Sequence, residues 1–156
     1  MSDWVAEFIG LDEQDHALVV GTRPLLEQAL PGILEGIQQR LLGSPRTRRH
    51  FELDGPADPE TVTRHLEHYV NAVVRCTPAE LEGFLGGVAT AHTAERGDPR
   101  VSVPLLESTA LLGFINAAVL DAVWALRLPE LRRQQAARAW TRLLWLQQAA
   151  FVRAAR

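Results

Sequence analysis

Residues 77–95, TPAELEGFLGGVATAHTAE, decide how the rest of the chain is interpreted. Thr77 has the character of an N-cap, a proline follows it at the first helical position, and Glu80 completes a capping box. Apolar residues then recur at helical spacing, and His92 follows the last of them by four residues. The spacing predicts a helix from Pro78 to Glu95 with His92 on its inward face.

The face that carries His92 is otherwise apolar, and its other members are Leu81, Phe84, Leu85 and Val88. An imidazole on such a face needs a partner, because an unpaired buried polar group costs roughly 2 kcal/mol or more. One interpretation is a core histidine bonded to a carbonyl group. The other is a ligand of haem iron, since a haem needs an apolar slot between helices and one neutral imidazole. Periodicity alone leaves both interpretations open.

Alternating β-branched runs are missing from the rest of the sequence, so an all-α fold is expected. Six to seven helices are predicted, over residues 12–20, 22–42, 59–75, 78–95, 102–126 and 129 to the C-terminus, and the last two are long. Thr22 is expected to cap the second helix, which Pro31 should kink or split. The segment 44–59 reads as loop.

Length and composition restrict the class of protein. The chain has 156 residues and a net charge of −3, which predicts one domain over 1–156 and argues against a nucleic-acid-binding module. The single cysteine excludes zinc or iron–sulfur sites built on cysteine. The apolar run 110–128 contains Asp121 and Arg127, so a buried helix is favoured over a membrane span. No secretion signal opens the chain, and a cytoplasmic location is expected.

Other candidate residues have two interpretations each. Tyr69 lies on the apolar stripe of 59–75, where it is either a core aromatic or a residue that contacts a ligand. Gln38 lies beside Ile37 and is either a solvated amide or a hydrogen-bond donor to a ligand. The pair His65 and His68, with His50 as a possible third ligand, suits a metal site less well than a solvated face. The basic cluster Arg46, Arg48 and Arg49 is interpreted as a solvated turn. No nucleophile elbow, P-loop or dinucleotide fingerprint occurs, so we expect no enzyme.

From about Asp12 to Phe151 the sequence resembles the protoglobins and the globin domains of globin-coupled sensors. The resemblance rests on the order and spacing of several segments, which are Leu30–Leu34 with Leu41–Pro45, Gly86–His92 with Arg96-Gly97, Val103–Leu106 and Ala139–Trp145. It implies a globin-like fold around a haem b, with His92 as the proximal iron ligand. Phe84, Leu85 and Val88 would then line the haem pocket.

On the distal side the sequence departs from the family pattern. The family commonly carries an aromatic residue and a tyrosine where this chain has Ile37 and Gln38. Either the Gln38 amide or Tyr69 on the facing helix would replace that tyrosine as a hydrogen-bond donor, with Val73 nearby. Arg96 and Arg100 are candidates for binding the haem propionates, since both follow His92 closely, although a solvated loop explains them equally well.

The resemblance further implies a sensor or carrier of oxygen, carbon monoxide or nitric oxide. The family pairs its last two helices into a homodimer, and here these helices carry four large aromatic residues, Trp124, Trp140, Trp145 and Phe151, as interface or core. A downstream output domain is a possible further partner. The alternative is a globin-shaped signalling or scaffolding dimer that holds no haem.

Overall fold

The computed structural model describes residues 4–52, 54–75, 80, 83–84, 86–88 and 105–154. Every regular element in these residues is helical, which confirms the all-α class. The elements are α1 (Trp4–Ile9), α2 (Glu13–Glu27), α3 (Leu30–Gly43), α4 (Pro45–Arg48), the 3₁₀ helix η1 (Arg49–Phe51), α5 (Pro59–Arg75), α7 (Leu105–Ala125) and α8 (Glu130–Ala154).

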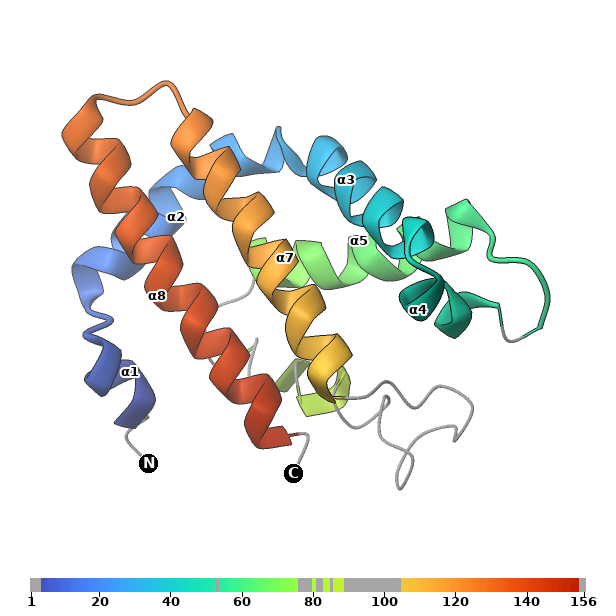
Figure 1. Cartoon of the computed structure of the whole chain (residues 1–156). Coiled ribbons are helices and arrows are strands. Elements are labelled where there is room, and N and C mark those ends of the chain that lie inside the picture. Colours follow the sequence, from blue (N-terminus) through green and yellow to red (C-terminus); the bar gives the residue numbers. More distant parts are fainter. Residues whose placement is uncertain are drawn as a thin grey trace.

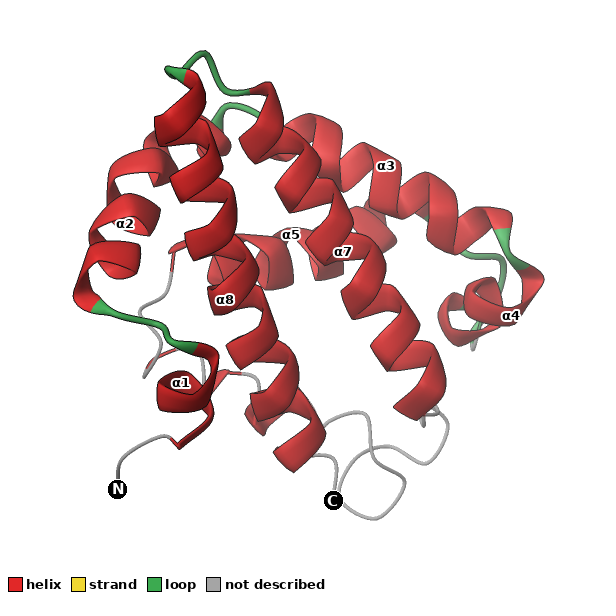
Figure 2. Ribbon diagram, turned by 60° about the vertical axis from the view of Figure 1, so that its left-hand side comes forward, coloured by secondary structure: helices red, strands yellow, loops and turns green. Residues whose placement is uncertain are grey.

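The last two helices, α7 and α8, run antiparallel and side by side, joined by a short turn (Figures 1 and 2). Helix α2 packs along α8, whereas α3 packs on both α5 and α7. In the view of Figure 1, α5 crosses behind α7. The long α7–α8 pair therefore forms one wall of the molecule, and α2, α3 and α5 complete the core behind it.

A single apolar core joins α2, α3, α5, α7 and α8. Its largest fully buried side chain is the indole of Trp140. The other side chains that are almost wholly removed from solvent are Leu26, Ile37, Val62, Val70, Val74, Ile115, Val119 and Leu144. Burial of each such leucine, isoleucine or valine stabilises the fold by roughly 1.5–3 kcal/mol. The buried stripe of α5 is therefore anchored in the core, and this fixes the orientation of the other side chains of the helix.

The predicted break at Thr22 is wrong, because α2 continues through it to Glu27. The helix begins instead with a capping box at Asp12 and Asp15, in which the Asp15 amide donates to Asp12 Oδ1 at 2.8 Å. Thr22 lies in the helix interior, and its hydroxyl donates to the Leu18 carbonyl at 2.7 Å. The same hydroxyl oxygen accepts from Trp140 Nε1 at 2.8 Å. Thr22 therefore stabilises the contact between α2 and α8.

Two proline-based expectations are confirmed. Pro31 separates α2 from α3 and lies in the first turn of α3, where its missing amide hydrogen breaks no helical bond. Helix α5 begins at Pro59, as predicted, and the carboxylate of Asp58 accepts from the Thr61 amide at 3.0 Å and the Thr61 hydroxyl at 2.7 Å. These bonds lower the pKa of Asp58 and hold the first turn of α5 in place.

Short helices were missed at two places. Helix α1 has only six residues and buries none of them, although Trp4 and Phe8 lie one turn apart and their rings are in contact. The segment 44–59, expected to be loop, contains α4 and η1. Its helical turns are stabilised by Thr47, whose hydroxyl donates to the Leu41 carbonyl at 2.7 Å.

The predicted helices over 59–75, 102–126 and 129 to the C-terminus correspond to α5, α7 and α8, with starts at Pro59, Leu105 and Glu130. Most of the predicted 78–95 helix lies outside the described residues, although Gly83, Phe84 and 86–88 are helical. No helix in the described part of the chain is long and apolar enough to cross a membrane.

Candidate functional site

Tyr69 lies on α5 beside the buried stripe that anchors this helix in the core. Its side chain is partly buried, and burial raises the pKa of the phenol well above its usual range. The hydroxyl makes no hydrogen bond to any described residue. Tyr69 therefore offers a donor that no described residue uses.

The ring of Phe84 contacts two neighbouring side chains of α5. Its centroid lies 6.1 Å from that of Tyr69 in a tilted arrangement, and 5.2 Å from that of His68 in an edge-to-face arrangement. Both distances suit stabilising ring contacts. Phe84 therefore packs directly on the α5 face that carries Tyr69. That these two segments form opposite walls of a slot stays a prediction.

Ile37 and Gln38, the other candidates for the distal side, differ in environment. Ile37 is completely buried in the core, so it contributes an apolar surface. Gln38 Nε2 donates to the carbonyl of Pro59 at 2.8 Å and thereby ties α3 to the first residue of α5. The donor capacity of this amide is already partly used within the protein.

Several candidates lie outside the described residues, namely His92, Leu85, Arg96 and Arg100, as does the side chain of Val73. Their roles stay predictions. Val88 is described as helical and half-buried, which agrees with its expected place on the face that His92 shares.

The histidines that suggested a metal pair point to other partners. His65 Nδ1 bonds the Thr61 carbonyl within its own helix at 3.0 Å, His68 packs on Phe84, and His50 bonds a carboxylate. Among the described residues, no three His, Cys, Asp or Glu side chains gather in a way that could hold a metal ion.

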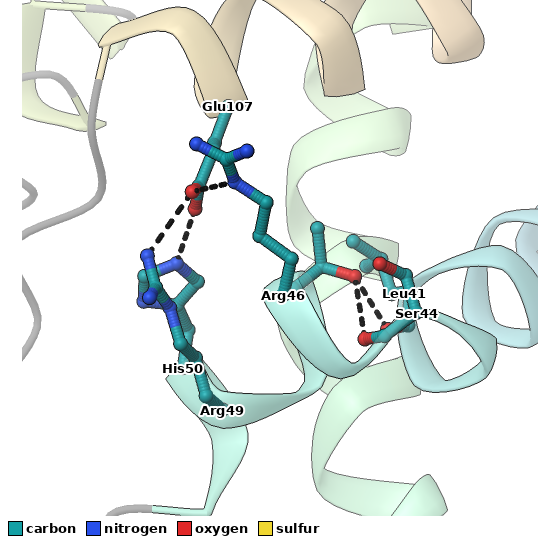
Figure 3. Close-up of polar contacts among 7 residues, drawn as sticks. Leu41, Ser44, Arg46, Arg49, His50 and Glu107 are labelled. Carbon is teal, nitrogen blue, oxygen red and sulfur yellow. Dashed lines mark hydrogen bonds and ion pairs between the residues drawn. The ribbon is translucent and has the colours of Figure 1, made fainter.

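An ion cluster that the sequence did not predict surrounds the buried carboxylate of Glu107, in the first turn of α7 (Figure 3). Its carboxylate, only 5% exposed, accepts from Arg46 Nε at 2.6 Å and from Arg49 Nη2 at 3.0 Å on Oε1. His50 Nε2 lies 2.7 Å from Oε2. Hydrogen bonds from Arg46 and then His50 lower the pKa of Glu107 to about 2. The cluster fastens α4 and η1 to the start of α7.

The basic cluster is therefore only partly the solvated turn that the sequence predicted. The side chains of Arg46 and Arg49 remain more than half exposed, yet both reach one buried acceptor. Arg48 pairs with Glu52 in the ordinary exposed manner, at 3.1 Å. The partner was missed because Glu107 lies 57 to 61 residues away along the chain, a separation at which no local pattern applies.

The aromatic residues of the last two helices divide between core and surface. Trp140 belongs to the core, whereas Trp124 of α7 is 49% exposed and Trp145 of α8 is 58% exposed. Leu106 and Leu131 on the same two helices are also exposed. The α7–α8 wall therefore presents large apolar side chains to solvent. The side chain of Phe151 is outside the described set.

Comparison with known proteins gives one match. The family model described as Protoglobin matches residues 2–155, which is almost the entire sequence. No curated protein and no solved structure matches this chain.

Proposed function

This chain belongs to the protoglobin family and has its globin fold, and on that premise we propose that it binds haem b and senses a diatomic gas. The observation that carries the proposal is Tyr69, a partly buried phenol without a hydrogen bond to any described residue, on the face of α5 that contacts Phe84. When bound, a haem supplies an iron with an open coordination position for oxygen, carbon monoxide or nitric oxide.

The chemistry of the described side chains supports this proposal. A haem is a flat and largely apolar disc, and α5 and the Phe84 segment carry apolar and aromatic side chains, with the Tyr69 hydroxyl as a polar atom beside them. Phe84 itself packs directly on Tyr69 and His68. His92 would hold the iron through a neutral imidazole, with its other ring nitrogen donating to a backbone carbonyl. Arg96 and Arg100 would pair with the propionates.

Tyr69 is the better candidate for the distal donor, because the Gln38 amide already donates to Pro59. Tyr69→Phe keeps the ring and removes only the hydroxyl. We expect oxygen release to become about tenfold faster, because the loss of one hydrogen bond has an effect of about this size. Gln38→Leu should change the off-rate less than about twofold and mainly lower stability, since the bond that ties α3 to the Pro59 carbonyl is lost. Stopped-flow measurement of oxygen dissociation from both variants checks this. Faster release from Gln38→Leu alone would assign the donor to Gln38 instead.

An absorption spectrum, recorded before and after haem is added, tests the proposed function itself. We expect a sharp Soret band that shifts when carbon monoxide is added to the reduced protein. A chain that stays colourless with added haem would refute the proposal.

We further propose that the protein forms a homodimer through α7 and α8. The exposed Trp124 and Trp145, together with Leu106 and Leu131, provide the apolar contact area that such an interface needs. Sedimentation velocity at micromolar concentration should give twice the chain mass of 17.3 kDa. A monomer under these conditions would contradict this assembly.

The second candidate function is a signalling or scaffolding dimer of globin shape that holds no haem. It is favoured by the internal bond of Gln38, which occupies the amide that would replace the usual distal tyrosine. The same haem titration separates the two, because only a scaffold would remain colourless.

A further inference from the structure

A second candidate site lies away from α5, where α2 passes the turn between α7 and α8. There a cavity of about 190 Å³ is lined by Gln14, Ala17, Leu18, Gly21, Thr22, Leu25, Leu128 and Arg132. Leu18 and Thr22 are buried at its floor, whereas Gln14, Gly21 and Arg132 are exposed, so the cavity opens to solvent. A cavity of about 150 Å³ is large enough for a six-carbon ring.

Gly21 helps to keep this cavity open. It lies inside α2 with no positive φ, so the backbone does not require a glycine there, and glycine weakens a helix interior relative to alanine. A Cβ atom at this position would meet no atom within 4 Å. Any larger side chain at Gly21 would therefore extend from the cavity wall into open space.

The polar groups at the mouth are without partners. The guanidinium of Arg132 and the amide of Gln14 make no hydrogen bond or ion pair within the described residues, although both line the cavity. The hydroxyl of Thr22 is by contrast already engaged with Leu18 and Trp140. The site thus combines apolar walls, from Leu18, Leu25 and Leu128, with a guanidinium and an amide that no described residue engages.

We propose that this cavity binds a small amphipathic carboxylate, an acid with about six carbons in all. The guanidinium of Arg132 would pair with the carboxylate, a geometry that suits its planar donors, and the Gln14 amide would add a further donor. The three leucines would cover the chain. This site is separate from the proposed haem pocket, so a test of carboxylate binding here does not depend on whether the protein binds haem.

Isothermal titration of the purified full chain with sodium hexanoate tests the proposal. For a ligand of this size we expect saturable binding with a dissociation constant of about 1 mM. Hexan-1-ol, which has the same chain without the charge, should bind at least about tenfold more weakly. Equal binding of the alcohol and the acid, or no saturation by hexanoate, would overturn the proposal.

Matched variants locate the binding. Arg132→Gln should weaken hexanoate binding about tenfold, whereas Arg138→Gln, at an exposed position of α8 outside the cavity, should leave it unchanged. Gly21→Leu should fill the cavity and abolish binding, while Gly32→Leu, at an equally open helical glycine of α3, should not. Circular dichroism confirms that each variant folds. Equal effects within either pair would place the acid elsewhere and refute the assignment.

Discussion

Replacing His92 by Ala is expected to abolish stable haem incorporation. The proposed haem would be held mainly by the bond from this imidazole to iron, since apolar walls alone fix neither the position nor the coordination of the group. We expect the purified His92→Ala protein to lose at least about 90% of its Soret absorbance at equal protein concentration, because haem without an axial ligand dissociates readily.

The control for this variant is His65→Ala. His65 is exposed on α5 and bonds the Thr61 carbonyl of its own helix, so its loss should leave the haem spectrum unchanged. Addition of free imidazole to His92→Ala should restore part of the Soret band by occupying the vacated position. A His92→Ala protein with a full, unshifted haem spectrum would refute the ligand assignment and leave His92 as a core histidine.

The fold was predictable where a helix carries its own apolar stripe and its own end signals. Helix α5 satisfies both conditions, with buried Val62, Leu66 and Val70 at helical spacing and Asp58 before Pro59, and its bounds were predicted correctly. Thr22 misled the prediction, because a threonine before a proline resembles an N-cap. Its hydroxyl is instead satisfied by Leu18 and by an indole 118 residues away, a contact that no local pattern contains.

The candidate site was predictable to the same extent. Tyr69 and Phe84 were recognised because each lies on an apolar stripe, and the structure brings their rings together. The engagement of Gln38 with Pro59 was not predictable, since it depends on the crossing of α3 over α5. The ion cluster at Glu107 escaped detection for the same reason, because tertiary packing brings its members together from distant parts of the sequence. The role of His92 stays a prediction.

Replacing Glu107 by Gln is expected to lower the melting temperature of the protein by about 5 °C at neutral pH. The glutamine has nearly the same shape, but it offers one acceptor oxygen in place of two and no charge. Arg46, Arg49 and His50 would then face one another without the anion that now holds them. The effect is moderated because both arginine side chains are more than half exposed, so solvent screens their attraction.

The pH dependence of this effect follows from the lowered pKa of Glu107. In the folded protein the pKa is about 2, below the ordinary value of 4.5 that applies after unfolding. The ionised carboxylate therefore stabilises the fold fully above about pH 4.5, and this contribution is lost as the pH falls toward 2. Thermal melts should show a constant difference between wild type and Glu107→Gln from neutral pH to about 5, and a shrinking difference below it.

Glu52→Gln is the matched control, since it removes an equal charge from the same corner of the molecule. Its carboxylate is 40% exposed and pairs with the similarly exposed Arg48, an arrangement worth little in water. We expect its melting temperature to stay within about 1 °C of the wild type. If Glu107→Gln and Glu52→Gln proved equally stable, the buried carboxylate would not be what fastens α4 and η1 to α7. If only Glu107→Gln is destabilised, and the difference shrinks below about pH 4.5, the cluster holds the segment between α3 and α5 against the first turn of α7.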